Sequence, residues 1–174
     1  MSAVIRPPHA LTDPTRIRAL ASIDFDNPAL RAALDKIAQR TAALTGLPVS
    51  MVTLVLDTAQ LIVGSCGLDD SWMTAAGGTP VEWSFCANTV TTGRPYVLPD
   101  TAHSEQAASP LVTVDGMASY AGVPITLAGH IVGAHCVMGL TAQPFTPEQL
   151  DQLRGAAAEI SDLLRQFSQP TSAN

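Results

Sequence analysis

Charged and aromatic residues are scarce in this sequence. Of its 174 residues, 14% are charged and 5% are aromatic, while 47% are hydrophobic. The core must therefore be built mainly from aliphatic side chains and alanine. The net charge is −6, and the eight arginines and the single lysine are scattered rather than clustered. Because nucleic acids attract a basic face, this distribution argues against nucleic acid as a partner.

We also expect neither a secretion signal nor a membrane-spanning helix. The N-terminal stretch MSAVIRPPHALTDPTR has no apolar run between a basic start and a cleavage site. The longest apolar tract, residues 120–140, contains Pro124 and an Ala128-Gly129 pair, which favour a hairpin over a spanning helix. There is no CxxC motif, and the odd number of cysteines indicates reduced thiols. We therefore expect a cytoplasmic protein with no part in a membrane.

Two long helices are predicted near the ends of the chain. Asn27 and Pro28 have the residue types of a helix start, and Gly46 is typical of a helix end. In FTPEQLDQLRGAAAEISDLLRQF, Thr146 is the expected N-cap and Gln149 completes a capping box. These signals make the C-terminal helix the clearest element of the sequence.

Strands are predicted between these helices. VSMVTLVLD and AQLIVGSCG are aliphatic, β-branched runs, a short strand is expected near residues 95–98, and the 119–140 tract predicts a hairpin turning at Ala128-Gly129. A short helix is expected around residues 86–92, whereas residues 101–118 are polar and irregular. This order of elements predicts an α+β fold with a central antiparallel sheet of about five or six strands.

In such a fold the N- and C-terminal helices lie on one face of the sheet. Loops and short helices cover the other face, where a pocket forms most easily. At this length we expect one domain, covering residues 14–167. Residues 1–13 and 168–174 are expected to be flexible tails.

The apolar residues of the C-terminal helix recur with alternating spacings of three and four, as in a heptad seam: Leu150, Leu153, Ala157, Ile160, Leu164 and Phe167. One interpretation is packing against the domain's own sheet, and Leu163 widens the stripe in favour of it. The other is a seam shared by two copies in a parallel homodimer.

Four segments resemble the GAF domain family, the small-molecule sensing module of signalling proteins. They are TRIRALASIDFDNPALRAALDKIAQRTAALTGLPVSMVTLVLD, WSFCANTVTTGRPYVLPDTA, SPLVTVDGMASYAGVPI and GHIVGAHCVMGLTAQPFTPEQLDQL. The second resembles the family's FCA segment, the third its NPLV…FYAGVPL segment, and the fourth its G..IGTLCVID segment. The resemblance covers roughly residues 14–167 and implies a stand-alone sensor of the GAF type.

Three departures from the family pattern are visible. Gly139 stands where relatives usually have an acid after the LCVI strand. The DPRF..NP segment of relatives is replaced by HSEQAASP, and the strand TAQLIVGSCG lacks their Arg-Trp-Phe cluster. The roles that these positions have in relatives therefore do not transfer to this chain.

Cys86 follows a candidate helix cap, Ser84, and a helix start can lower a thiol pKa and make the thiol reactive. Buried cysteines are nevertheless common in cores, so we interpret Cys86 as part of a pocket wall, with thiol chemistry as the alternative.

His135 and Cys136 are neighbours in a strand and face opposite ways. We expect Cys136 in the core and His135 toward the pocket, where it would bind an anion or serve as an axial haem ligand. Tyr120 would supply a hydroxyl in a mostly apolar pocket. The expected ligand-binding residues are Trp83, Phe85, Cys86, Asn88, Thr89, Asp100, Leu111, Tyr120 and His135.

Three functions remain open from the sequence. The first is a non-catalytic module that binds a small molecule or anion and signals through a partner such as a sensor kinase. The second is a GAF-fold thiol enzyme, such as a free methionine sulfoxide reductase, working through Cys86 or Cys66. The third is a ligand-free GAF domain that serves to dimerise or to act as a scaffold.

Overall fold

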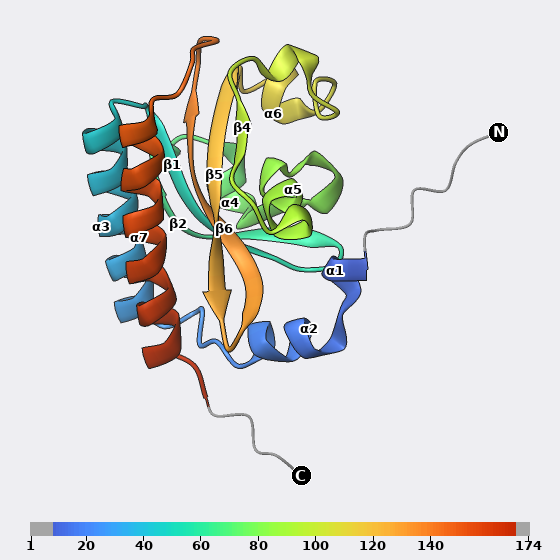
Figure 1. Cartoon of the computed structure of the whole chain (residues 1–174), viewed down its shortest axis with the longest axis vertical. Coiled ribbons are helices and arrows are strands. Elements are labelled where there is room, and N and C mark those ends of the chain that lie inside the picture. The colour runs from blue at the N-terminus through green and yellow to red at the C-terminus, as the bar shows by residue number, and fades with distance from the viewer. Residues whose placement is uncertain (1–8, 170–174) are drawn as a thin grey trace, which may run out of the picture.

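The computed structural model describes residues 9–169 as a six-stranded antiparallel sheet with helices on both faces (Figure 1). The helices are α1 (His9–Thr12), α2 (Pro14–Ala21), α3 (Pro28–Thr45), α4 (Trp72–Ala76), α5 (Phe85–Thr92), α6 (Pro110–Thr113) and α7 (Pro147–Gln166), with 3-10 turns η1 (Val81–Trp83) and η2 (Thr101–His103). The strands are β1 (Val49–Val55), β2 (Ala59–Cys66), β3 (Gly78–Pro80), β4 (Tyr96–Leu98), β5 (Ser119–Leu127) and β6 (His130–Gly139). Their order in the sheet is β3-β2-β1-β6-β5-β4.

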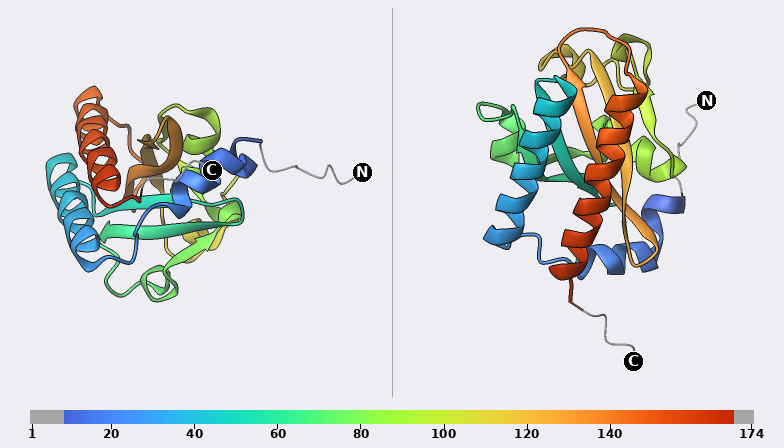
Figure 2. Two further views of the ribbon diagram at one scale, coloured as in Figure 1. Left: turned by 90° about the horizontal axis from the view of Figure 1, so that it is seen from below. Right: turned by 60° about the vertical axis from the view of Figure 1, so that its left-hand side comes forward.

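The two faces of the sheet are covered differently. The long helices α3 and α7 lie side by side on one face (Figures 1 and 2). The other face carries α4, η1, α5, η2 and α6 with their loops, residues 71–76, 81–93 and 99–118, which we call the cover. Each face has its own buried apolar cluster, as the α+β prediction requires. Within the described residues, no helix is both long and apolar enough to cross a membrane.

The predicted helix signals have the expected geometry. The Asn27 side chain accepts a hydrogen bond from the Ala29 N–H at 2.9 Å, and Gly46 ends α3 with a φ of 74°. Thr146 and Gln149 form the capping box at the start of α7. Gln149 also donates a hydrogen bond to the Thr45 carbonyl at 2.9 Å, so the same cap fixes α7 against the end of α3.

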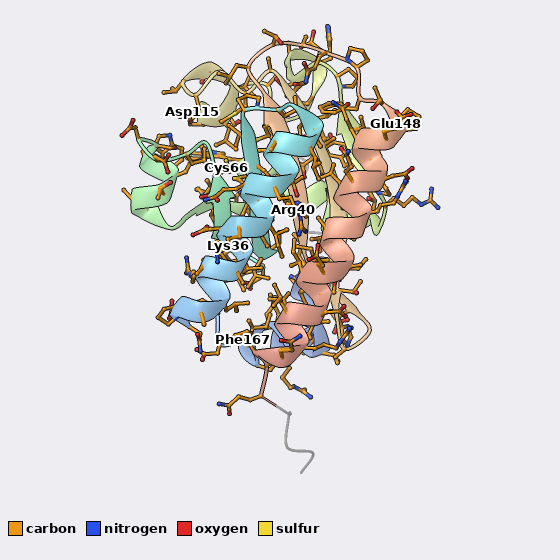
Figure 3. All side chains as sticks on the ribbon, turned by 90° about the vertical axis from the view of Figure 1, so that its left-hand side faces the viewer. Lys36, Arg40, Cys66, Asp115, Glu148 and Phe167 are labelled. Carbon is orange, nitrogen blue, oxygen red and sulfur yellow. The ribbon has the colours of Figure 1, made fainter. Side chains whose placement is uncertain are left out.

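The heptad residues of α7 are used inside the domain. Leu153, Ile160 and Leu164 are fully buried in the cluster between α7, α3 and the sheet. Across the outer side of these two helices, Arg40 of α3 forms an ion pair with Glu159 of α7 (Figure 3). The stripe is therefore explained by intramolecular packing, and the homodimer stays a prediction without support from this seam.

The β5–β6 hairpin turns at Ala128-Gly129 as predicted, with φ values of 52° and 79° at the two residues. A β-bulge between Ile125 and Thr126 then shifts the register by one residue, so that Tyr120 lies opposite Met138. The bulge puts Val132 and Ala134 in different apolar clusters, although they are two residues apart in β6. Cys136 is buried in the core, as expected, on the face beneath the cover. The expected facing of His135 is wrong, because its ring contacts α3.

Ordered structure extends beyond the predicted tail boundaries. Residues His9–Thr12 form α1, and Leu11 is buried with only 3% of its surface exposed. At the other end, Ser168 forms a β-bridge with Ile23, and the Gln169 N–H donates to the Ser22 carbonyl at 2.8 Å. The other residues of the expected tails lie outside the described part of the chain.

Candidate functional site

The face beneath the cover contains an unusual concentration of sulfur. Every methionine within the described residues lies there, together with two of the three cysteines. We call these residues the sulfur-rich cluster: Met51, Met73, Cys86, Met117, Cys136 and Met138. Each is at most 4% exposed. Because methionine is unbranched and flexible, such a wall can change shape with little loss of packing.

Tyr120 crosses the centre of this face because β5 has a glycine two residues further on. A Cβ atom on Gly122 would lie only 2.7 Å from Cζ of Tyr120, so the ring rests directly on the glycine backbone. Gly122 is opposite Cys136 in the sheet. The glycine thus allows the phenol hydroxyl of Tyr120 to reach the cysteines.

Cys86 is positioned above these residues by α5. The Ser84 hydroxyl accepts a hydrogen bond from the Ala87 N–H at 3.1 Å, as predicted for the helix cap. The Tyr120 hydroxyl donates to the Cys86 sulfur at 3.1 Å, and Thr89 lies 3.3 Å from the same hydroxyl. Cys136 and Thr53 lie close enough to the Cys86 thiol to influence its pKa. All of these groups are buried.

The contact between the two thiols affects them in opposite directions. Burial by itself raises the pKa of Cys86, but the neighbouring Cys136, Thr53 and Tyr120 side chains outweigh burial and lower that pKa. The neighbouring Cys86 thiol and burial hold the pKa of Cys136 well above its usual value. Burial, followed by the nearby cysteines, raises the pKa of Tyr120 in the same way. Cys86 is therefore the thiol of this pair that ionises more easily.

The structure brings five of the predicted ligand residues together. Phe85, Cys86, Thr89, Leu111 and Tyr120 are at most 2% exposed, and the Phe85 and Tyr120 rings are 5.1 Å apart between centroids. Sequence reasoning missed Cys136 and the four methionines. Their shared position depends on the register of β6 and on the folding of the cover, neither of which has a local sequence signal.

Three other predicted residues lie at the margin of the cluster. Trp83 is half-buried and makes an edge-to-face contact with Trp72, with ring centroids 6.0 Å apart. Asn88 is hydrogen-bonded to the Tyr96 hydroxyl near the sheet edge. Asp100 caps η2 by accepting a hydrogen bond from the Ala102 N–H at 3.0 Å.

His135 is the predicted residue that the structure places elsewhere. Its Nδ1 is 2.9 Å from the Met51 carbonyl, and its Nε2 is 2.9 Å from the Thr41 hydroxyl of α3. Burial lowers the pKa of His135 to about 4, so the ring is neutral near pH 7. Because both ring nitrogens are hydrogen-bonded, one to β1 and the other to α3, the structure gives no support to a haem at His135. Within the described residues, no group of three or more histidine, cysteine or acidic side chains is arranged to hold a metal.

Four buried side-chain oxygens have no hydrogen-bond partner within the described residues. They belong to Gln106 and Ser109 in the cover, Ser119 at the start of β5, and Gln152 in α7. Burying such a group without a hydrogen bond is costly. The free energy lost here would be recovered if a bound molecule or water supplied the missing hydrogen bonds.

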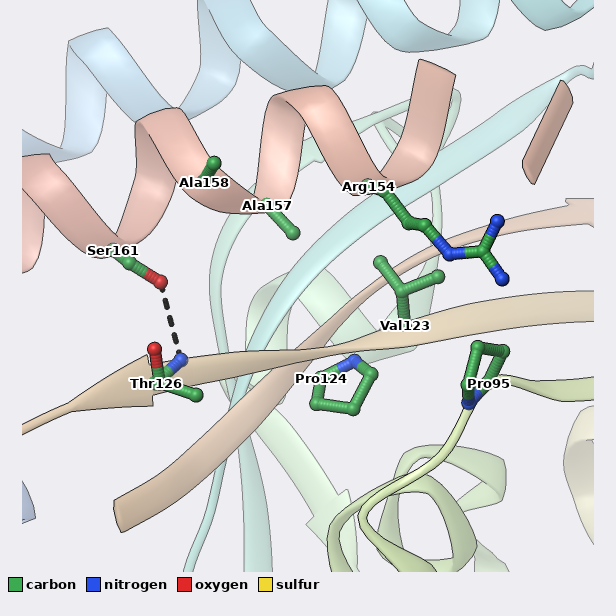
Figure 4. Close-up of a pocket in the computed structure, with 8 residues that line it drawn as sticks. All are labelled: Pro95, Val123, Pro124, Thr126, Arg154, Ala157, Ala158 and Ser161. Atoms are coloured by element: carbon green, nitrogen blue, oxygen red, sulfur yellow. Dashed lines mark hydrogen bonds between the residues drawn. The ribbon is translucent and has the colours of Figure 1, made fainter. Parts of the chain in front are cut away.

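Open clefts occur on other parts of the surface. One of about 290 Å³ lies between α7 and β5, where the Ser161 hydroxyl accepts a hydrogen bond from the Thr126 N–H at 3.1 Å (Figure 4). A second, of about 300 Å³, is lined by Arg16 and by the turn of the β5–β6 hairpin. Neither cleft is lined by Cys86, Leu111 or Tyr120. These three residues contact the sulfur-rich cluster instead of an open cavity.

Comparison with known proteins identifies the fold. The family model described as "GAF domain" matches residues 29–164. The chain is similar to the GAF domain of a phosphoenolpyruvate-protein phosphotransferase from Coxiella burnetii, with 15% identity, a TM-score of 0.68, and 87% and 93% of the two chains covered. The corresponding domain from Acinetobacter has 18% identity, a TM-score of 0.66, and coverages of 87% and 91%.

An enzyme is among the proteins of similar structure. A type II free methionine-R-sulfoxide reductase from Thermoplasma acidophilum has 13% identity and a TM-score of 0.66, and the match covers 80% of this chain and 94% of that one. At this identity the likeness concerns the fold alone. No curated protein sequence gives a significant match.

Proposed function

The chain belongs to the GAF domain family, whose members commonly serve in sensing and signalling, and from this membership we propose that it is a sensory domain that binds a small molecule beneath its cover. The ligand-binding residues are then Phe85, Cys86, Thr89, Leu111 and Tyr120, with Trp83, Asn88 and Asp100 at the rim. The domain is non-catalytic and passes its signal to a partner protein, such as a sensor kinase.

The observation that carries this proposal is the set of unpaired buried oxygens in the cover. Gln106 and Ser109 belong to the same irregular segment as Leu111, and their side-chain oxygens have no hydrogen-bond partner among residues 9–169. A ligand with hydrogen-bond donors, or an anion that brings ordered water, would satisfy them. The methionines beneath the cover could move aside to admit it.

The cover has a contact that must open for such a ligand. The indole N–H of Trp72 donates to the Asp115 carboxylate, with distances of 2.9 and 3.1 Å to its two oxygens, and this joins α4 to the loop after α6. Both partners are partly exposed, so the contact contributes little to stability. Opening this contact would separate the two parts of the cover above the sulfur-rich cluster.

Binding is tested first on the purified protein. Native mass spectrometry and an absorbance spectrum reveal a retained molecule, haem or other chromophore. Thermal unfolding and calorimetry are then measured with nucleotides, cyclic nucleotides, nitrate and a set of metabolites. A compound that binds should raise the melting temperature in proportion to its concentration above Kd.

The variant Ser109→Ala tests whether the ligand binds beneath the cover. Ser109 has no side-chain capping bond, so removal of its unpaired hydroxyl should leave the stability of the ligand-free protein unchanged or slightly higher. Its affinity for the ligand should fall, whereas Thr58→Ala, in an exposed turn, keeps the affinity of the wild type. Equal affinities in all three proteins would place the ligand elsewhere.

The tight packing beneath the cover favours a second candidate function. Phe85, Leu111 and Tyr120 already fill the volume where a guest would lie, as expected for a ligand-free scaffold domain. No stabilisation by any compound, together with a stable complex with a partner protein, would support the scaffold. The same burial of Cys86 does not favour a reductase, because a substrate has no open path to its sulfur.

A further inference from the structure

Two cysteines from distant parts of the chain meet inside this domain. Cys86 is on α5 in the cover, and Cys136 is in the middle of β6 in the sheet. Both are at most 1% exposed in the same buried cluster, where the Tyr120 hydroxyl donates to the Cys86 sulfur and Gly122, beneath the Tyr120 ring, is paired with Cys136. The two thiols lie close enough to shift each other's pKa. The helix start at Ser84 and the register of β6 both fix this contact.

The surroundings of the pair suit thiol oxidation more than plain packing. The Tyr120 hydroxyl donates to the Cys86 sulfur at 3.1 Å. Such a donor favours the thiolate, which is the form that reacts with oxidants. The remaining cysteine, Cys66, is half-exposed at the end of β2, where it lies opposite Ser50 in the sheet (Figure 3).

We propose that Cys86 and Cys136 form an oxidation site, at which hydrogen peroxide converts the buried dithiol into a disulfide that ties the cover to the sheet. The inference does not depend on the small-molecule function, because it requires only the two thiols and a small oxidant. Cys86 is the thiol that peroxide attacks first, and Cys136 is the resolving thiol.

The reaction proceeds in two balanced steps. The Cys86 thiolate attacks one oxygen of hydrogen peroxide, the O–O bond breaks, and Cys86 sulfenic acid and one water are formed. The Cys136 sulfur then attacks the Cys86 sulfur, the S–O bond breaks, and the oxygen leaves as a second water. In total the dithiol loses two electrons and two protons, and peroxide is reduced to two molecules of water.

Burial determines which product forms. Larger thiols such as glutathione have no access to Cys86 in the closed structure, whereas Cys136 is already in contact with it. The sulfenic acid is therefore resolved within the chain. The resulting disulfide would hold α5 against β6 and prevent the cover from opening.

The test uses the Cys66→Ser variant, which retains only the two buried thiols, with the wild type in parallel. Each protein is treated with hydrogen peroxide, alkylated with N-ethylmaleimide in denaturant, and digested without reduction for mass spectrometry. The expected result is a linked peptide pair containing Cys86 and Cys136, the loss of two hydrogens from the intact mass, and full reversal by dithiothreitol. Free thiols at both positions after treatment that oxidises Cys66 in the wild type, or cross-links only between chains, would overturn the proposal.

Two further variants test the order of events. In Cys136→Ala the reaction should stop at Cys86 sulfenic acid, which dimedone traps, whereas Cys86→Ala should give no trapped product at Cys136. Tyr120→Phe removes the hydrogen bond to Cys86 and should slow disulfide formation several-fold while the linked product stays the same. Trapping at Cys136 instead of Cys86 would contradict the assigned roles.

Discussion

His135 was expected from the sequence to bind a ligand, but in the structure its side chain holds elements of the fold together. The Met51 carbonyl only accepts hydrogen bonds, so the neutral ring carries its proton on Nδ1, and Nε2 faces the Thr41 hydroxyl. The ring therefore joins β1, β6 and α3. Its burial makes protonation unfavourable in the folded state.

Stability should consequently depend on His135 in mildly acidic solution. The pKa of His135 is about 4 in the folded protein, below the ordinary histidine value of about 6.5, so between these pH values the unfolded chain binds a proton that the folded chain does not. The free energy of unfolding therefore falls as the pH decreases from 6.5 to 4, by up to about 3 kcal/mol. Urea unfolding at several pH values should show a flatter curve for His135→Gln than for the wild type. His103→Gln, at an exposed histidine, is the control, and parallel curves for wild type and His135→Gln would contradict the assignment.

Gly122 is a residue whose importance lies in the side chain that it accommodates. Gly122→Ala would place a methyl group against the Tyr120 ring, so the ring must move and its hydrogen bonds to Cys86 and Thr89 are lost. We expect destabilisation of about 1–3 kcal/mol. In a Tyr120→Ala background the same substitution should cost much less, because the ring is gone. Chemical denaturation of the four proteins measures this coupling, and strictly additive effects would show that Gly122 has another role.

At the scale of elements, features that depend on neighbouring residues could be predicted from the sequence, whereas the register between strands could not. Asn27, Thr146 and Gln149 make contacts within a few residues, so their caps were predictable from sequence. The bulge at Ile125 was not predictable, because both faces of β6 are apolar and no alternation of polar residues reveals the register. For the same reason the sequence did not show that His135 faces the helices instead of a pocket.

Two glycines in different elements should respond oppositely to the same substitution. Gly155 is exposed in α7, and a Cβ atom there would meet nothing within 4 Å, so Gly155→Ala should stabilise the protein by about 0.5–1 kcal/mol. In Gly64 of β2 the Cβ would lie 2.7 Å from that of Leu34 in α3, so Gly64→Ala should destabilise by about 1–3 kcal/mol. Thermal and urea unfolding give both signs directly. A gain at Gly64 would mean that α3 is free to move away from the sheet.

At the scale of the molecule, the sequence predicted the helix layer, the sheet and the cover, but not how tightly the cover packs on the sheet. The order of helices and strands indicated a sheet with long helices on one face and an irregular cover on the other, and the structure confirms this. The closure of the cover depends on pairs such as Trp72 with Asp115 and Cys86 with Cys136, which are far apart in sequence. Contacts of this kind have no periodicity or spacing from which to predict them.

The N-terminal limit of the domain depends on a similar long-range contact. The Arg16 guanidinium is 3% exposed and donates to the carbonyls of Ala10 and Leu11 at 2.9 Å each, and to that of Val55 at 2.6 Å. It thereby holds α1 against the end of β1, with the Leu11 side chain buried beneath α5. Residues 9–13 therefore form part of the folded unit.

A chain that begins at Pro14 should be less stable than one that begins at His9. The shorter chain lacks the buried side chain of Leu11 and two acceptors of the buried Arg16 charge, which together should cost about 2–4 kcal/mol. The chain that begins at His9 keeps all of these contacts and serves as the matched control. Urea unfolding should give a lower midpoint for the shorter chain, and hydrogen exchange should be faster at the end of β1 and in α5. Equal midpoints would show that the domain is complete from residue 14 onward and that α1 only rests on its surface.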